Sequence, residues 1–238
     1  MEINEKKDFV GENRFIAYLD ILGYESHIAK IGVSGLANVL NESIKQSKEM
    51  ITYFQKANEE RSDNYDFDIK VFSDNFFFCT KKDWFGLALL SSLVQGGLML
   101  SGILVRGSIC YGEIYFSEDF VCGKGLIDAY KLESEIAIYP RIIIDSSYFD
   151  SVEKISTSNL DRLQKLSRKS GDGYEFLDYM RRCLGDDRLV SDFLNVQKKH
   201  VEDNLKETEN NRVKQKYQWL KNYHNSFCKE HGYDEHLI

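Results

Sequence analysis

Disulfide bonds are the first feature that this sequence lacks. The chain has five cysteines, an odd number, and no C-x-x-C pair among them. Three of them lie among apolar residues, as buried free thiols do; the full set is Cys79, Cys110, Cys122, Cys183 and Cys228. This pattern is typical of a reduced, intracellular protein rather than of a disulfide framework.

Long hydrophobic runs are also missing. No stretch reaches the ~18 uninterrupted apolar residues of a membrane span. The N-terminal segment MEINEKKDFV is charged and lacks the apolar core of a secretory signal. We therefore expect a soluble, cytoplasmic protein that has no membrane partner.

An excess of positive charge is absent as well. The formal net charge is −7, which argues against sequence-blind binding to nucleic acid, because such binding relies on a basic surface. The same charge is compatible with a nucleotide substrate. A triphosphate site needs cations close to the phosphates, and the overall sign of the protein matters less.

Hydrophobic residues make up 42% of the 238 residues and aromatic residues 13%, which is ample for a packed core. The single proline, Pro140, and a change in composition and periodicity near residue 155 divide the chain. Short β-rich runs alternate with helical patterns before that point, and polar, helical periodicity follows it. We predict a catalytic domain over residues 1–154. Residues 155–238 are predicted to form a helical C-terminal extension that packs on this domain or on a dimer interface.

The apolar segments of the first domain predict an alternation of strands and helices. Strands are expected at 15–19, 67–72, 76–80, 103–116 and 141–145, and helices at 34–58, 84–99 and 125–136. The order is β-α-β-β-α-β, extended by a helix and a strand. It predicts an α+β fold with a ferredoxin-like or palm-type, antiparallel-rich sheet and helices packed on one of its faces.

Two aspartates occupy special places in this predicted topology. Asp20 ends the first strand, and Asp74 lies at the tip of a hairpin beside it. Taken singly, Asp20 is more typical of a helix cap and Asp74 of a turn. Together their carboxylates would converge on one edge of the sheet, where a pair can hold two divalent ions against a phosphoryl group. Gly23 follows closely and lets backbone amides approach a phosphate.

Four segments, in order over residues 14 to 136, resemble the class III adenylate and guanylate cyclases. They are Y-L-D-I-L-G-Y at 18–24, I-K-V-F-S-D at 69–74, R-G-S-I-C-Y-G-E at 106–113 and K-L-E-S at 131–134. The first two are similar to the metal motifs of that family, and the third to its R-x-G-I-x-x-G strand. The last lies where the family carries R-L-E-S.

The resemblance implies a role for each matching position. Asp20 and Asp74 would bind two divalent ions, Mn²⁺ or Mg²⁺, together with the carbonyl of Ile21. Lys70 would contact the base and Arg106 the triphosphate. In such homodimers the metal ligands come from one chain and the base contacts from its partner. The ribose 3′-hydroxyl would attack the α-phosphorus and expel pyrophosphate.

Other candidate substrate-binding residues surround these positions. Gly23 and Tyr24 follow the first aspartate and are expected beside the phosphates. Lys124 lies in G-K-G, which lacks the frame of a phosphate-binding P-loop but leaves the lysine as a secondary phosphate contact.

The last segment departs from the family pattern. Class III cyclases have N-x-x-x-R there, in which the asparagine orients the ribose and the arginine stabilises the transition state. Here the two positions are Ile127 and Lys131. Lys131 supplies charge without the fork of an arginine, and isoleucine cannot replace the amide. The base-selecting acid of purine cyclases is also not evident, so the departures argue against a purine substrate before they argue against cyclisation.

A second resemblance covers nearly the whole chain. The L-D-I-L-G start, the V-R-G-S-I-x-x-G strand, residues 123–133 and residues 216–225 are similar to the bacterial pyrimidine cyclases of the Pycsar antiphage systems. This similarity implies synthesis of cyclic UMP or cyclic CMP as an antiphage signal that a separate effector protein reads. UTP is the favoured substrate, although no residue identifies the base.

Alternative interpretations remain open at this point. The chain could be a purine cyclase with an unusual transition-state set, a catalytically silent nucleotide-binding module, or an interaction protein that acts through its C-terminal helices. The last segment also contains a zinc-like Cys228-x-x-His231 spacing with His224 and His236 nearby, for which we favour surface or interface histidines. Residues 216–220, KYQWL, could bind nucleic acid, but aromatic residues at helical spacing favour a core or dimer contact.

Overall fold

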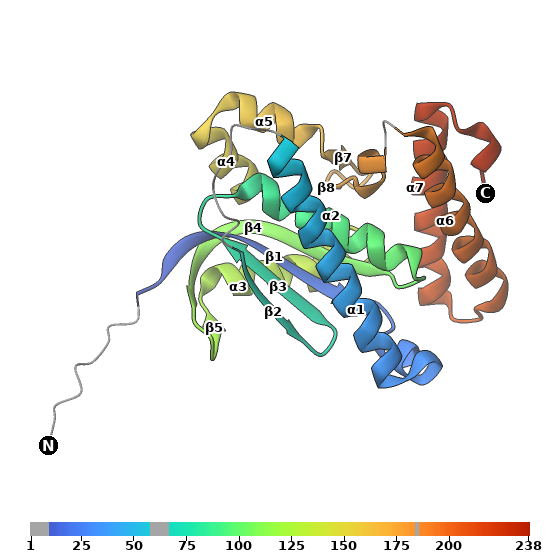
Figure 1. Ribbon diagram of the computed structural model, residues 1–238, viewed down its shortest axis with the longest axis horizontal. Helices are drawn as coiled ribbons and strands as arrows, with labels where there is room; N and C mark the ends of the chain where they lie inside the picture. Colours follow the sequence, from blue (N-terminus) through green and yellow to red (C-terminus); the bar gives the residue numbers. More distant parts are fainter. Residues whose placement is uncertain (1–9, 58–66, 184–185) are drawn as a thin grey trace, which may run out of the picture.

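A computed structural model describes residues 10–57, 67–183 and 186–238. The first six elements are β1 (Glu12–Ile21), α1 (Tyr24–Ala57), β2 (Asp68–Phe72), β3 (Asn75–Thr80), α2 (Trp84–Leu100) and β4 (Val105–Phe116). They form the predicted β-α-β-β-α-β unit, in which β1 pairs antiparallel with both β3 and β4, and β2 pairs antiparallel with β3. Figure 1 shows this sheet with α1 crossing in front of it.

The following elements enlarge the sheet and add helices. They are β5 (Val121–Cys122), α3 (Lys124–Lys131), the π-helix η1 (Leu132–Ile136), β6 (Ile142–Ile144), α4 (Ser146–Ile155), α5 (Thr157–Gln164), β7 (Ser167–Lys169), β8 (Glu175–Leu177), the 3₁₀-helix η2 (Tyr179–Cys183), α6 (Asp187–Glu207), α7 (Asn211–His231) and the 3₁₀-helix η3 (Asp234–His236). The strand order within the described residues is β2-β3-β1-β4-β6-β8-β7, with β5 paired to β4. The sheet is mostly antiparallel, which confirms the predicted α+β class.

The pleat of β1 divides its side chains between two hydrophobic layers. Phe15, Ala17 and Leu19 face the layer that contains α1 and α2, while Ile16 and Tyr18 face the opposite layer, which contains α3. The prediction that the helices pack on one face was therefore wrong, because α3 covers the other face (Figure 1).

Two glycines allow α3 to lie so close to the sheet. A Cβ atom on Gly112 of β4 would lie 2.8 Å from the Cα atom of Gly125 in α3. A Cβ atom on Gly125 would in turn lie 2.6 Å from the Cδ1 atom of Ile16. Larger side chains at these positions would push helix and sheet apart, so the pair sets the depth at which α3 and the following π-helix sit.

The helix α1 begins ten residues before its predicted start. It follows a turn at Gly23, where φ is 74°, and it contains a kink at Gly32, where φ is 71°. Both values lie in the left-handed region that glycine adopts without steric strain. The chain therefore turns sharply after β1 and runs back along the sheet.

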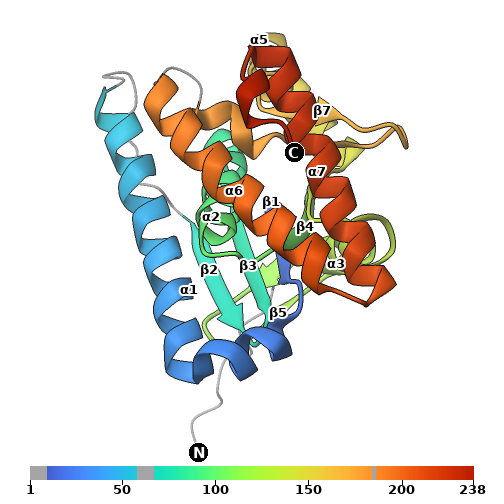
Figure 2. The same ribbon diagram turned by 90° about the vertical axis from the view of Figure 1, so that its right-hand side faces the viewer.

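The C-terminal segment is more than a set of helices. β7 and β8, of three residues each, continue the sheet beyond β6, and neither is long enough to show a period of two in the sequence. Figure 2 shows α6 and α7 side by side at this side of the molecule. Their apolar residues share a cluster with Leu22, Leu104 and Phe176, so the segment is continuous with the core of the first 154 residues. The division at residue 154 stays a prediction.

Buried polar side chains link helices α6 and α7 to the C-terminal residues. The side chain of His224 is fully buried, with Nδ1 2.8 Å from the amide oxygen of Gln197 and Nε2 2.9 Å from the carbonyl oxygen of His236. The preference for surface histidines was thus wrong for His224 and His236, which are buried. They tie the C-terminus to α6 and α7. No group of three or more metal-binding side chains is found in the described residues, and none of the described helices is long and apolar enough to cross a membrane.

We predict that His224 makes the fold sensitive to acid. Burial lowers the pKa of His224 from 6.5 to about 4. Between these values the unfolded chain binds a proton that the folded protein does not, so the free energy of unfolding decreases as the pH falls, by up to about 3 kcal/mol. In urea titrations from pH 7 to pH 4, the stability deficit of a His224→Gln variant should shrink as the pH falls. A deficit that stays constant over this range would contradict the assignment.

Candidate active site

The two predicted metal-binding aspartates lie side by side at one end of the central strands. Asp20 is the penultimate residue of β1 and pairs with Asn75 of β3. Asp74 lies in the two-residue turn between β2 and β3, where Ser73 has a φ of 55°. The amide of Ile21 donates a hydrogen bond of 2.9 Å to the carbonyl oxygen of Asp74, which fixes the turn against the end of β1. The structure therefore brings Asp20, Ile21 and Asp74 together.

Arg106 connects Asp20 to a third carboxylate. It lies directly opposite Asp20 in the β1–β4 ladder, and its Nε atom donates a hydrogen bond of 3.0 Å to Oδ2 of Asp20. The same Nε atom lies 2.6 Å from Oε1 of Glu133, which is only 2% exposed. Among the described residues, the two terminal nitrogens of the guanidinium group have no hydrogen-bond partner. They remain available for an anion.

Glu133 is a site residue whose role the sequence comparison did not identify. It belongs to the K-L-E-S segment, which carried the resemblance, but nothing in the sequence indicated that its side chain turns inward. It lies in the π-helix η1, directly after α3. Such a widening of a helix changes the direction of the following side chains and is frequent at functional sites.

The electrostatics of this cluster favour the binding of cations. Burial raises the pKa of Glu133 to about 7, although the positive charge of Arg106 opposes the shift. Burial also raises the pKa of Asp20; Arg106 lowers it and the charge of Asp74 raises it further. Asp20, Asp74 and Glu133 thus repel one another, Arg106 contacts only Asp20 and Glu133, and positive charge brought to the cluster relieves the repulsion.

The donor set fits a hard divalent ion. Asp20 and Asp74 provide carboxylate oxygens, and Ile21, whose carbonyl the resemblance adds as a ligand, is held next to them by its amide hydrogen bond to Asp74. Mg²⁺ is commonly held by one or two carboxylates together with substrate phosphates, rather than by a complete protein cage.

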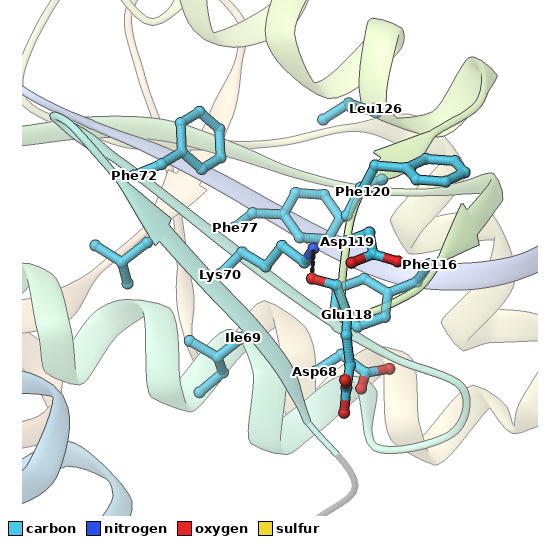
Figure 3. Close-up of a pocket in the computed structure, with 12 residues that line it drawn as sticks. Asp68, Ile69, Lys70, Phe72, Phe77, Phe116, Glu118, Asp119, Phe120 and Leu126 are labelled. Carbon is cyan, nitrogen blue, oxygen red and sulfur yellow. Dashed lines mark hydrogen bonds between the residues drawn. The ribbon is translucent and has the colours of Figure 1, made fainter.

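A second feature of the same sheet face is a cavity of about 770 Å³ between β2 and the β4–β5 hairpin. Figure 3 shows Lys70 pointing into it. The Nζ atom of Lys70 donates a hydrogen bond of 2.7 Å to the carbonyl of Glu118 and lies 5.3 Å from the centre of the Phe116 ring. Other residues that line the cavity are Asp68, Phe72, Phe77, Phe120 and Leu126. A cation and aromatic rings in one cavity suit a planar, polar ring such as a nucleobase.

The strand register relates this cavity to the carboxylates. Phe72 pairs with Asn75, which pairs with Asp20, so all three side chains share one face of the sheet. Two strand spacings separate Phe72 from Asp20, about 10 Å. The cavity and the carboxylates of one protomer therefore lie on the same face of the sheet.

The other predicted residues lie farther from these groups or face solvent. Lys131 is exposed at the end of α3, and no hydrogen bond or ion pair links it to the carboxylates in the described part of the chain. Lys124 is exposed and pairs with Asp128 on its own helix at 2.5 Å. Gly23 is exposed in the turn that precedes α1, and Tyr24 packs against the core.

A residue of the C-terminal extension also lies near the carboxylates. Lys216 of α7 is half-buried, and burial lowers its pKa; the charge of Arg106 lowers it further, whereas the charge of Asp20 raises it. The sequence had assigned residues 216–220 to a core or dimer contact. That holds for Tyr217 and Leu220, which are buried in the second hydrophobic cluster, but not for the lysine.

Comparison with known proteins finds cyclases among solved structures. The monomeric guanylyl cyclase domain of the RhoGC fusion protein from the aquatic fungus Blastocladiella emersonii is 11% identical, with a TM-score of 0.49 over 71% of this chain and 95% of that chain. The catalytic core of a rhodopsin-guanylyl cyclase with converted specificity, in complex with ATPαS, is 12% identical, with a TM-score of 0.49 over 70% and 96%. A bacterial light-regulated adenylyl cyclase is 11% identical, with a TM-score of 0.39 over 80% and 59%. No protein-family model and no curated protein match the sequence.

We predict that the charge of Glu133 destabilises the metal-free protein at neutral pH. Its pKa is about 7 in the folded protein and near 4.5 when unfolded, so the folded state alone binds the proton between these values. Stability therefore decreases as the pH rises through this window, by up to about 3 kcal/mol. A Glu133→Gln variant lacks this loss, so its unfolding free energy relative to wild type should increase from pH 4.5 to pH 7.5 in denaturant titrations with EDTA. A difference that does not change with pH would show that Glu133 is ionised throughout.

Proposed function

We propose that this protein is a metal-dependent nucleotidyl cyclase that converts a pyrimidine nucleoside triphosphate, UTP or CTP, to its 3′,5′-cyclic monophosphate and pyrophosphate. The observation that carries the proposal is the convergence of Asp20 and Asp74 beside Arg106, on the sheet face that also holds the Lys70 cavity. The four cyclase-like sequence segments contribute these same residues.

Each group has a task in such a reaction. Asp20, Asp74 and the carbonyl of Ile21 would hold two divalent ions, Mn²⁺ or Mg²⁺, which supply the positive charge that activates the hydroxyl and neutralises the leaving group. Arg106 orients Asp20 through Nε, and its terminal nitrogens face the phosphates. In the reaction, a bond forms between the ribose 3′-oxygen and the α-phosphorus, and the bond to pyrophosphate breaks. The hydroxyl proton passes to solvent.

The cavity around Lys70 would bind the base. Its rim exposes apolar side chains, among them Phe72 at 54% and Phe120 at 47%. Such aromatic groups at the edge of a cavity are typical of a surface that a partner covers. We infer a homodimer in which the cavity of one protomer faces the carboxylates of the other, as the resemblance to class III cyclases implies. In the same proposal, a separate effector protein reads the cyclic nucleotide as an antiphage signal.

One observation favours a second function. Ile127 stands where class III cyclases carry an asparagine, and it is 54% exposed; Lys131 is also exposed. Neither side chain can orient a ribose in the isolated chain. A catalytically silent nucleotide-binding module is therefore the alternative, and product formation distinguishes the two.

We predict that the purified protein with Mn²⁺ forms one cyclic pyrimidine monophosphate. It should be incubated separately with ATP, GTP, CTP and UTP, and the products resolved by chromatography and mass. Asp20→Asn and Asp74→Asn keep the shape of each side chain but remove the charge that holds the ions, so each should lower turnover at least about 100-fold. Asp150→Asn, at an exposed position of α4 outside the cavity and the carboxylate cluster, is the matched control for a lost carboxylate. A purine product would revise the substrate, and no product from any nucleotide would favour the silent module.

We predict that two inactive variants complement each other within one dimer. Asp20→Asn and Lys70→Ala chains carrying different tags are co-expressed, and the heterodimer is isolated through both tags. If carboxylates and cavity meet across the interface, one of the two sites is intact and activity recovers to about half of the wild-type value. The control heterodimer joins Asp20→Asn with Asp74→Asn, which damage the same half-site and should not recover. Equal inactivity of both heterodimers would place the whole site within one chain.

A further inference from the structure

Helix α7 of the C-terminal extension packs beside the segments that contain the active-site residues. Leu220 is fully buried and lines a small cavity with Leu104 and Val105, the residues that immediately precede Arg106. Tyr217 and Leu220 also share an apolar cluster with Leu22 and Leu132. Leu22 follows Asp20 by two residues, and Leu132 precedes Glu133. Helix α7 therefore packs on residues adjacent to Asp20, Arg106 and Glu133.

The packing of α7 determines where Lys216 lies. It is one helical turn before Leu220, so both residues are on the same side of α7. Because side chains on a helix lean toward its N-terminus, the lysine extends away from Leu220 along that side, toward the start of α7. The electrostatic influence of Asp20 and Arg106 on Lys216 is consistent with this placement next to the carboxylates.

The surroundings of Lys216 favour the binding of an anion. It makes no hydrogen bond or ion pair within the described residues, although it is half-buried. Arg212 lies four residues earlier on the same helix and repels it. The charge of Asp20 attracts this ammonium group, whereas burial and two guanidinium groups oppose it, so a further anion bound between these cations would stabilise all three.

We propose that Lys216 binds the β- and γ-phosphates of the nucleotide, so that the C-terminal extension supplies a cation to the leaving pyrophosphate. This inference rests on the proposed function and adds a substrate-binding residue to it. The phosphates would lie between the ammonium group of Lys216 and the terminal nitrogens of Arg106, while the α-phosphate lies at Asp20 and Asp74. Positive charge at this place stabilises the leaving group as its bond to the α-phosphorus breaks.

The test compares the affinities of α7 charge variants for nucleotides that carry one or three phosphates. Lys216→Met keeps the apolar stem of the side chain and removes the charge, Lys216→Arg keeps the charge, and Lys214→Met is an exposed control on the same helix. Affinities are measured by calorimetry, with Ca²⁺ or Mn²⁺ present, for UMP, UTP and CTP and for the non-cyclisable α,β-methylene analogues of the two triphosphates. The folding of each variant is checked by circular dichroism. We expect Lys216→Met to weaken triphosphate binding about 10- to 100-fold and to change monophosphate binding less than about twofold. Lys216→Arg should recover most of the affinity, and Lys214→Met should match wild type.

Three results would overturn the inference. Equal triphosphate affinity of wild type and Lys216→Met would remove Lys216 from the substrate site while leaving the proposed function intact. Tighter binding of Mn²⁺ to Lys216→Met without nucleotide, with unchanged nucleotide affinity, would show that the lysine only neutralises the carboxylates. A folded wild-type protein that neither binds nor cyclises any of these nucleotides would overturn the proposed function together with the inference.

Discussion

The organisation of this site depends on a single guanidinium group between two carboxylates. Arg106 contacts Asp20 at 3.0 Å and Glu133 at 2.6 Å, and both acids are largely withdrawn from solvent. Removing the arginine would leave Asp20 and Glu133 close together without a compensating positive charge, which is unfavourable for two acids withdrawn from solvent. The arginine thus joins β1, β4 and the π-helix η1 electrostatically, at the end of the sheet where Asp74 also lies. Any change in the depth of α3 would move Glu133 away from this contact, which gives the close approach of Gly112 and Gly125 its significance.

Much of the architecture follows from local patterns in the sequence. The buried run before Asp20, the hairpin around Ser73 and Asp74, and the apolar helix α2 each have a strong periodicity or a turn signal, and the structure contains all three. Features that depend on contacts between distant segments were not predictable in this way. The depth at which α3 packs on the sheet depends on a glycine pair separated by 13 residues, and β7 and β8 are too short to be recognised without the strand that they extend.

The same distinction applies to the site. Asp20, Asp74 and Arg106 come together because strand pairing places them there, and a correct strand order is sufficient to predict it. The inward direction of Glu133 requires the π-helix, and the position of Lys216 requires the packing of α7 on the start of β4. Neither is encoded as a local pattern. The aromatic residues around Lys216 indicate that the helix is buried. A role for the charge of Lys216 becomes evident only after folding brings it near carboxylates from distant parts of the chain.

The exposed positions on α3 and the half-buried Lys216 on α7 have a common interpretation. Transfer at a phosphate requires positive charge near the leaving group, but it does not require that one particular helix provides it. In this chain the position that matches the transition-state arginine of class III cyclases is the solvent-facing Lys131, while Lys216 on α7 lies within electrostatic reach of Asp20 and Arg106. A site that receives its cation from the C-terminal helices would tolerate the loss of polar groups on α3, as at Ile127. The extension would then be a part of the nucleotide site rather than an appendage to it.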